Sequence, residues 1–263
     1  MIVFVDLSYF VFHRFFAMKR WCQLAKKTFD TQDEKLEKFA KLFEDNIVAF
    51  KKKHKFEWNR LFFVRDCQKE RIWRMKLYGE YKKNREDRNL DFDPTVFTHT
   101  YEVIIPHMLQ KYGMHMIGYD CAEADDVVAV LHNYIRKNQP ERSILILTND
   151  NDYVQLADKH TTIVNCNKAD LCARTSEDAL SCFALWKVIK GDESDNIPSI
   201  EKKIGDKAAL KLAQSPELLA AKLASSHEVA AQFNLNKKLI DFEEIPADIR
   251  SGIEAKFGNV VLG

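Results

Sequence analysis

Short runs of β-branched and aromatic residues alternate along the chain with longer segments in which apolar residues recur every three or four positions. The short runs predict five strands, at residues 2–5, 61–64, 115–117, 144–147 and 162–164. The longer segments predict helices at residues 36–53, 94–112 and 124–136, and Pro106 is expected to kink or break the second. Strands separated by helices are typical of an α/β fold with a mostly parallel central sheet flanked by helices.

The last third of the chain has a different pattern. From about residue 176 the strands stop, and short segments rich in Ala and Leu follow, as in ALWKVIKG, DKAALKLA and PELLAAKLA. This change predicts an α/β core over residues 1–185 and an all-helical region over residues 186–263. Because the sequence has no internal repeat, no low-complexity segment and no Ser/Gly/Pro linker, we expect the two regions to pack against each other.

Composition places the chain among soluble globular proteins, since 46% of its 263 residues are hydrophobic and 30% are charged. The first residues, MIVFVDLSYF, have no basic segment before the apolar run, and Asp6 interrupts that run. They therefore predict neither a secretory signal nor a membrane span, and we expect an intracellular protein with no membrane partner. The six cysteines form no CxxC pair, which favours free thiols in a reducing compartment.

Charge is segregated along the chain although the net charge is only +1. Residues 51–88 contain fourteen Lys/Arg and six Asp/Glu, whereas residues 120–195 contain fourteen Asp/Glu and eight Lys/Arg. The basic segment also carries Trp73, Tyr78 and Tyr81, so it offers both phosphate partners and flat rings for bases. A basic helix face is common without such a role, but here it indicates nucleic acid, and the acidic segment indicates cations.

Several acids follow the predicted strands directly. Asp6 ends the first, Asp66 follows the second, Asp150 follows the fourth, and the EADD segment at Glu123 opens the helix after the third. The carboxyl ends of parallel strands meet at one edge of a sheet, where ligands bind in open α/β folds. Each acid alone is an ordinary turn former or an acid at a helix start. Together they would repel one another strongly unless cations lay between them.

Ligands of this kind suit Mg²⁺, with Mn²⁺ as a substitute, because hard cations prefer carboxylate oxygen while zinc prefers His and Cys. Two such ions can activate a water and stabilise the leaving oxygen when a phosphate ester is cleaved. Nucleases, phosphatases and polymerases all use this chemistry, so the acids alone do not choose among them. A phosphatase of the haloacid dehalogenase type would need a DxDx[TV] motif, which the sequence at Asp6 does not supply.

Four sequence blocks carry a specific resemblance. They are VDLSYF at Asp6, RDCQKERIWRMKLYGEYKKNR from residue 65, EADDVVA with TNDNDYVQL from residue 123, and GDESDNIPSIEKKIGDKAALKL from residue 191. In this order the chain resembles the 5′ nucleases, a PIN-like family that includes flap endonucleases, phage-type 5′-3′ exonucleases and the amino-terminal nuclease domain of bacterial DNA polymerase I. The resemblance spans most of the chain. It implies a PIN-like core, an arch at about residues 67–93 and a helix-hairpin-helix-type element in the helical region.

The resemblance also implies a set of metal ligands for two Mg²⁺ ions. By their positions in the four blocks, the acids expected to hold or surround the ions are Asp6, Asp66, Glu123, Asp125, Asp126, Asp150, Asp152, Asp192 and Asp195. Asp192 and Asp195 are three residues apart and are expected to share one face of a turn or helix.

The arch residues resemble a phosphate-handling segment of the family. Lys82 is expected to steer and polarise the scissile phosphate, with Arg74 and Arg85 as its partners. Tyr81 and Lys83 are expected to contact the nucleic acid, Tyr81 by stacking on a base near the cut.

The helical region is expected to bind duplex phosphate at a tight turn that includes Ile204, Gly205 and Lys207, with K⁺ beside it in relatives. The sequence SIEKKIG departs from the family's GVxGIG, and Ser199 replaces its first glycine. Leu7 similarly replaces the glycine that usually follows the first aspartate.

The function predicted from these features is a monomeric, structure-specific 5′ nuclease that acts in replication or repair on DNA carrying a 5′ single-stranded end or flap beside a duplex. Two alternatives stay open. A PIN-type or RNase H-like ribonuclease would share the acidic core but would lack the arch and hairpin blocks. A non-catalytic DNA-junction-binding protein would have lost one or more of the acids, whereas every acid of the set is present.

Overall fold

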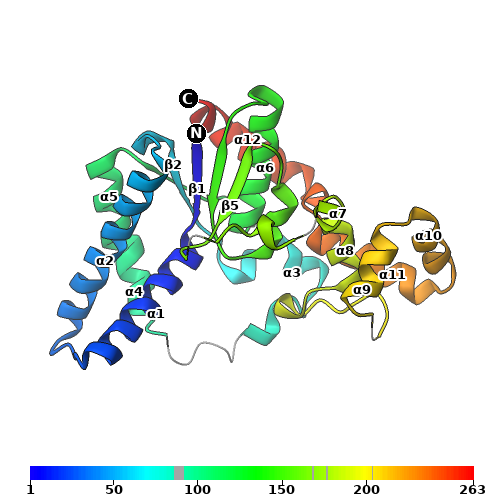
Figure 1. Ribbon diagram of the computed structural model, residues 1–263, viewed down its shortest axis with the longest axis horizontal. Coiled ribbons are helices and arrows are strands. Elements are labelled where there is room, and N and C mark those ends of the chain that lie inside the picture. Colours follow the sequence, from blue (N-terminus) through cyan, green and yellow to red (C-terminus); the bar gives the residue numbers. More distant parts are fainter. Residues whose placement is uncertain (86–91, 168, 176, 203) are drawn as a thin grey trace.

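The fold is built on a single parallel sheet. The computed structural model describes residues 1–85, 92–167, 169–175, 177–202 and 204–263. The strand order is β3-β2-β1-β4-β5 and every adjacent pair is parallel (Figure 1). The strands are β1 Ile2–Asp6, β2 Leu61–Val64, β3 His115–Ile117, β4 Ile144–Leu147 and β5 Thr161–Val164. The α/β class and the positions of all five predicted strands are confirmed.

Both faces of the sheet are buried, as alternation within β1 shows. Val3 and Val5 point into one apolar cluster and Ile2 and Phe4 into the other, and all four are fully buried. The chain adds strands first on one side of β1 and then on the other, so β1 and β4 are neighbours at the point where the winding reverses. The carboxyl ends at such a switch point are where open α/β sheets bind ligands.

Helices near the amino terminus cover one face of the sheet. They are α1 Leu7–Ala25, α2 Gln32–His54, α4 Thr95–His99 and α5 Ile105–Tyr112, with a π-helical turn at Thr100–Ile104 between the last two. Pro106 lies in the first turn of α5. It has no N–H for an α-helical bond, and the π turn precedes it, so the predicted interruption of this helix is confirmed.

Helix α1 was not predicted from the apolar pattern. Its phenylalanines fall on more than one face, since Phe10 and Phe15 are buried while Phe16 is exposed, and this spread hides the period of 3.6 residues. The helix begins at Asp6, whose side chain accepts a hydrogen bond from the Tyr9 N–H at 3.0 Å. The same residue therefore ends β1 and caps α1.

The opposite face is covered by α6 Ala124–Asn138 and by the last helix, α12 Ala247–Leu262. Ile253, Phe257 and Val261 of α12 belong to the same apolar cluster as α6 and the sheet. The carbonyl oxygen of Gly263, after α12, accepts a hydrogen bond from Arg60, the residue before β2, at 2.8 Å. The last helix of the predicted helical region, residues 186–263, thus packs on the core.

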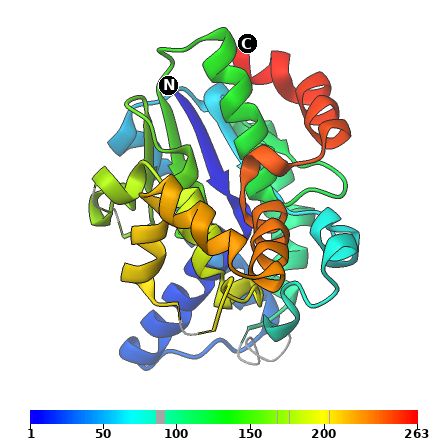
Figure 2. The ribbon, with the colours of Figure 1, turned by 90° about the vertical axis from the view of Figure 1, so that its right-hand side faces the viewer.

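A further group of helices forms a lobe beside the sheet (Figures 1 and 2). They are α7 Glu177–Leu180, α8 Phe183–Lys190, α9 Asp206–Ala213, α10 Pro216–Ala224 and α11 His227–Ile240. The buried Asn236 joins them, because its amide donates to the carbonyls of Val188 at 2.9 Å and Pro198 at 2.8 Å. Buried amide hydrogen bonds of this kind fix the loop after α8 against α11.

The predicted arch segment contains a 3-10 turn at Lys69–Arg71, α3 Trp73–Leu77 and a 3-10 turn at Lys83–Arg85. Its part from residue 86 to 91 lies outside the described residues. Among the described residues, no helix has the length and hydropathy needed to cross a membrane. The six cysteines, all half-buried, carry free thiols, as predicted.

Candidate metal centre and nucleic-acid cleft

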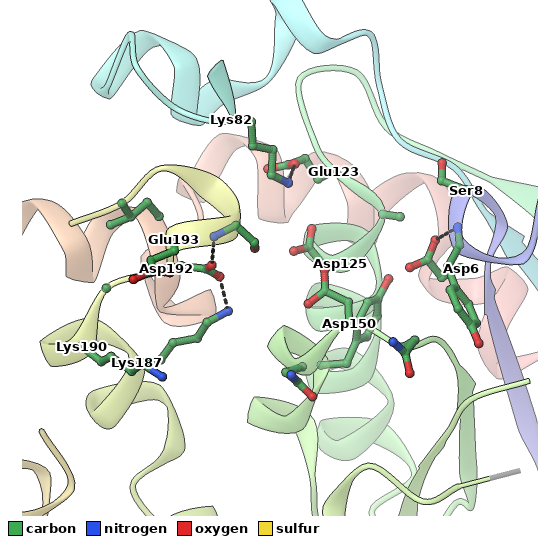
Figure 3. A pocket seen from close by; sticks show the side chains of 18 of the residues that line it. Asp6, Ser8, Lys82, Glu123, Asp125, Asp150, Lys187, Lys190, Asp192 and Glu193 are labelled. Atoms are coloured by element: carbon green, nitrogen blue, oxygen red, sulfur yellow. Dashed lines mark hydrogen bonds and ion pairs between the residues drawn. The ribbon is translucent and has the colours of Figure 1, made fainter. Parts of the chain in front are cut away.

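A cleft of about 1520 Å³ lies between the carboxyl edge of the sheet and the helical lobe. Acids from both sides line it: Asp6, Asp66, Glu123, Asp125, Asp150 and Asp192. Figure 3 shows Asp125 and Asp150 pointing toward each other, with Asp6 on one side and the pair of Asp192 and Lys187 on the other. Sequence segments far apart in the chain therefore bring carboxylates to one cavity.

Asp6 and Asp66 are held in place by fixed donors at the ends of β1 and β2. Asp6 accepts a hydrogen bond from the Thr148 hydroxyl at 3.0 Å in addition to its bond as helix cap. Asp66 accepts from the Ser8 hydroxyl at 2.7 Å and from the Ala124 N–H at 2.9 Å. Burial, followed by repulsion from Asp66, raises the pKa of Asp6 to about 7. In the part of the chain that the structure describes, no cationic side chain is among the main influences on the pKa of Asp6.

Asp125 sits in the first turn of α6 and faces the same cavity. Burial raises its pKa well above the usual value, and the charges of Asp126 and Glu123 raise it further. Carboxylate oxygens of Glu123, Asp125 and Asp126 lie within 4.8 Å of one another. Asp150 caps the 3-10 turn Asn151–Leu156 and is exposed on the cleft side.

A second acid group joins the sheet edge to the helical lobe. Carboxylate oxygens of Asp152, Asp192 and Asp195 lie within 4.8 Å of one another. Asp192 caps the 3-10 turn Glu193–Asp195 through a 2.7 Å bond from the Ser194 N–H, so Asp192 and Asp195 share one turn, as expected. Lys187 of α8 forms ion pairs with Asp152 and, at 2.7 Å, with Asp192.

Neighbouring lysines favour the ionised form of two carboxyl groups on this side of the cleft. Burial opposes ionisation of Asp192, but Lys187 outweighs it and lowers the pKa of Asp192 to about 2. Similarly, burial opposes ionisation of Glu123, and Lys82 and Arg74 lower the pKa of Glu123 to about 2. Lys82 pairs with Glu123 and, at 3.4 Å, with Asp195. Lys187 and Lys82, the latter together with Arg74, thus keep Asp192 and Glu123 negatively charged.

Asp126 does not point into the cleft with its neighbours. It has no exposed surface, and its carboxylate accepts from Arg74 at 2.7 and 2.8 Å and from the Trp73 indole N–H at 2.9 Å. It also accepts from the Glu123 N–H at 3.1 Å and so completes a capping box at the start of α6. These contacts hold Asp126 on the side of the core, while its carboxylate also lies within 4.8 Å of those of Glu123 and Asp125, so its expected place around a metal stays a prediction.

Arg74 is buried in the same network, with 2% of its surface exposed. Besides Asp126 it contacts Glu123 at 3.1 Å, and its Nε donates to the Leu239 carbonyl of α11 at 2.7 Å. Burial opposes its charge, but Asp126 holds the pKa of Arg74 well above the usual value. The expected contact of Arg74 with a scissile phosphate is not available to a side chain enclosed in this way, which instead joins the core to the lobe.

Tyr81 is likewise part of the interior, with 2% exposure. Its hydroxyl lies 2.8 Å from Glu123 Oε2 and 3.2 Å from Asp195 Oδ2. The expected stacking of Tyr81 on a base is therefore corrected, since the ring has no exposed face. Lys83 is exposed and pairs with Glu80 at 2.9 Å, and the side chain of Arg85 lies outside the described residues.

The hairpin residues lie at the start of α9. Gly205 occupies the N-cap position, Lys207 is exposed in the first turn, and Ile204 lines the cleft. Residue 203 lies outside the described residues, so the turn that contains it is not described. Duplex binding and a K⁺ site at this point stay predictions.

Both acid groups fit hard divalent cations. Their donors are carboxylate oxygens close enough to share an ion, and Mg²⁺ and Mn²⁺ prefer such donors. Burial is the largest cause of the raised pKa values of Asp6 and Asp125, and repulsion from neighbouring carboxylates adds to it, so a bound cation would favour the ionised form of both. Glu123 and Asp125 would take part in holding one cation, and Asp152, Asp192 and Asp195 in holding another. Asp6, Asp66 and Asp150 line the same cleft and would complete the ligand set.

Sequence reasoning missed three residues that shape the cleft: Ser8, Thr148 and Lys187. The hydroxyls gave no signal because Ser and Thr are common at strand and helix ends. Lys187 did give one, since a lysine stands inside the apolar stretch FALWKVIK and is 8% exposed. A buried lysine needs a charged partner, which the acids supply.

An acid-rich cavity at the switch point of a parallel sheet is the arrangement of phosphoryl-transfer enzymes that use divalent cations. The profile of one family, described as 5'-3' exonuclease, N-terminal resolvase-like domain, matches residues 1–181. The chain belongs to this 5'-3' exonuclease family.

Individual relatives agree with this assignment. A 5'-3' exonuclease of Buchnera aphidicola is 32% identical over 175 residues, which cover 64% of this chain and 56% of the relative. DNA polymerase I of Caldicellulosiruptor bescii is 31% identical over 153 residues, or 53% of this chain and 17% of the polymerase. Ribonuclease H of Enterobacteria phage T4 is 27% identical over 79% of this chain and 73% of its own length. The chain thus spans about half of the exonuclease and a small part of the polymerase.

Solved structures extend the similarity to nearly the whole fold. The bacteriophage T5 flap endonuclease, in a pseudo-enzyme-product complex with DNA and metal ions, superposes with a TM-score of 0.72 at 15% identity, covering 100% of this chain and 99% of that chain. Another T5 structure, co-crystallised with metal ions, has a TM-score of 0.71 at 17% identity and covers 99% and 98%. The helical lobe and the returning last helix therefore belong to the shared fold.

Proposed function

We propose that the chain is a divalent-metal-dependent 5′ nuclease that hydrolyses phosphodiester bonds of DNA at or near a 5′ single-stranded end. The observation that carries this proposal is the cleft in which carboxylates from the sheet edge meet carboxylates from the helical lobe. Membership of the 5'-3' exonuclease family and the fold of a flap endonuclease support it. DNA with a 5′ flap or recessed junction is the proposed substrate.

Mg²⁺ is the proposed cofactor, with Mn²⁺ as a substitute, and each acid group described above would hold one ion. Bound ions would supply an activated water and would stabilise the leaving oxygen. The chain's own residues position the phosphate. Lys82 reaches the cleft from the arch segment, where its ammonium group would attract the scissile phosphate and stabilise the charge that develops on it.

The helical lobe is proposed to contact duplex DNA through the start of α9, where Lys207 and the backbone N–H groups of the first turn meet solvent. The arch segment would pass over the single strand. Cleavage in this arrangement would leave a 5′ phosphate. We further propose that the protein acts as a monomer and that K⁺ binds beside the hairpin turn.

A direct test uses a 5′-flap duplex, a blunt duplex and a single strand of the same sequence, each labelled at the 5′ end. With Mg²⁺, the flap duplex is expected to release a short labelled product, and EDTA or Asp150→Asn is expected to abolish it. Lys137→Asn, an exposed change on α6 far from the cleft, is the matched control and should cleave normally. Cleavage that persists in EDTA would contradict the proposal.

A second substrate is measured in parallel because one relative that covers most of this chain is named ribonuclease H. An RNA strand paired with DNA, labelled at its 5′ end, separates the two activities in the same assay. Faster cleavage of the hybrid than of the DNA flap would move the proposed substrate to RNA–DNA hybrids. Binding without any cleavage would instead favour a junction-binding protein.

A further inference from the structure

Helix α1 carries large apolar side chains that are partly exposed, one of which, Phe16, also contacts the rings of Phe15 and Phe92. Phe16 and Trp21 are each 40% exposed and Leu24 is 78% exposed, although all three lie on the outer half of one helix. Phe16, Arg20 and Leu24 repeat every fourth residue and therefore share one face. On a surface helix this face is normally polar, and a group of large apolar side chains exposed there marks an interaction surface.

The charge of this helix is equally one-sided. From Leu7 to Phe29 the chain has no Asp or Glu, but it has Arg14, Lys19, Arg20, Lys26 and Lys27. Two lysines lie over the ring of Trp21, Lys27 at 5.4 Å and Lys38 at 4.8 Å from its centroid. Arg14 is half-buried and donates to Asn46, so the positive charge at the exposed side chains comes from Arg20 and from the lysines over Trp21. The complement of aromatic rings beside such cations is a polyanion that also has flat apolar faces.

Helix α1 starts in the cleft. Tyr9 and Phe12 belong to the first turns of α1 and line the same cavity as the acids. From Tyr9 to Leu24 the helix rises by roughly 22 Å, at about 1.5 Å per residue. In Figure 1 α1 runs from the end of β1 away from the helical lobe. A strand that enters the cleft beside Asp6 can thus continue along α1 toward Trp21.

We propose that the outer face of α1, formed by Phe16, Arg20, Trp21 and Leu24, is a binding track for single-stranded nucleic acid that is continuous with the cleft. A single strand is favoured over a duplex, because only unpaired bases present faces to exposed aromatic side chains while the phosphates meet lysine and arginine. The inference rests on the proposed function, because the track gives a path to a strand that the nuclease cleft would hold. Its binding test does not require cleavage.

The test measures, by fluorescence anisotropy in EDTA, the affinity for a fluorescein-labelled oligothymidylate of twelve residues. The affinity for a three-residue oligothymidylate is measured for comparison. Arg20→Glu and Trp21→Ala alter exposed side chains, so the fold should persist and circular dichroism checks it. Each is expected to weaken binding of the long oligomer about fivefold or more, and Arg20→Glu should lower the slope of log K against log salt by about 0.7 for each phosphate that the variant no longer neutralises. Lys137→Glu, the same charge reversal on α6, is the control and should change little.

The proposal is wrong if both α1 variants bind the twelve-residue oligomer with wild-type affinity. It is also wrong if they lose no more affinity than Lys137→Glu loses. If the variants changed the sedimentation coefficient while the oligomer still bound normally, the face would be a self-association surface and the proposal would fail. Flap cleavage by the wild type reports separately on the nuclease activity. A protein that cleaves while its α1 variants bind normally refutes the track alone, and one that binds through α1 but never cleaves refutes the nuclease alone.

Discussion

Asp125 and Asp126 are adjacent in the chain and chemically identical, yet the structure gives them opposite roles. Asp126 is fully buried and accepts bonds from Arg74, Trp73 and the Glu123 N–H, whereas Asp125 faces the cleft. Substituting each by Asn changes the charge and keeps the shape. We expect Asp126→Asn to unfold the protein more easily and Asp125→Asn to impair metal binding alone.

The size of the first effect follows from the buried ion pair. Removing one partner of such a pair costs about 3–5 kcal/mol, because the other charge stays buried without compensation. Asn keeps one acceptor oxygen for Arg74, so the lower end, about 3 kcal/mol, is expected. For a chain of this size that corresponds to a fall in Tm of roughly 6–12 °C.

Guanidinium unfolding in EDTA, followed by circular dichroism, measures both variants without a cation. Asp125→Asn should be as stable as the wild type or more stable, because it removes a carboxylate that Asp126 and Glu123 repel. Adding Mg²⁺ should stabilise the wild type and not Asp125→Asn. These two roles are wrong if the free energy of unfolding of Asp126→Asn is within about 1 kcal/mol of the wild-type value. They are also wrong if Asp126→Asn abolishes the Mg²⁺ effect while Asp125→Asn keeps it.

Three further predictions concern the fold. Burial opposes ionisation of Asp158, but its bond with Arg136 lowers the pKa to about 2, so its stabilisation holds above its ordinary pKa and is lost as the pH falls toward 2. Asp158→Asn should therefore destabilise most at pH 7 and about half as much at pH 3, where the native carboxylate is still mostly ionised, as urea midpoints at the two pH values will show. Gly191 has φ +77°, and a Cβ there would lie 2.5 Å from the Ile197 carbonyl oxygen. Gly191→Ala should therefore lower Tm and weaken Mg²⁺ binding by the neighbouring Asp192 group, as a Mg²⁺ titration will measure. Phe43→Ala empties a fully buried position and should cost about 3–5 kcal/mol in denaturant unfolding, with a smaller loss arguing that the site collapses.

The sheet and the meeting of its acids were predictable because they depend on local patterns and on topology. Asp6, Asp66 and Asp150 follow their strands closely, and parallel strands leave them at one edge whatever the details of packing. The direction of a side chain within the first turn of α6 was not predictable. Which of Asp125 and Asp126 turns inward depends on where Trp73 and Arg74 pack, and those residues lie some fifty positions earlier.

Two other features depended on tertiary contacts for the same reason. The buried ring of Tyr81 has the same sequence neighbours as a tyrosine on an exposed helix face, and only the approach of Glu123 and Asp195 encloses it. The last helix, α12, reads like the helices of the lobe before it, since its apolar positions do not say which partner they cover. That partner is α6, on the far side of the sheet from α1.

The return of α12 has a consequence for how the molecule is made. Ile253, Phe257 and Val261 complete an apolar face that includes residues of β1, β2 and α6, which were synthesised more than a hundred residues earlier. A ribosome must therefore translate the entire helical lobe before the core can close, and the nascent core keeps an apolar face accessible to chaperones until then. A fragment cut at the end of the lobe should accordingly aggregate, even though it would contain every acid of the cleft.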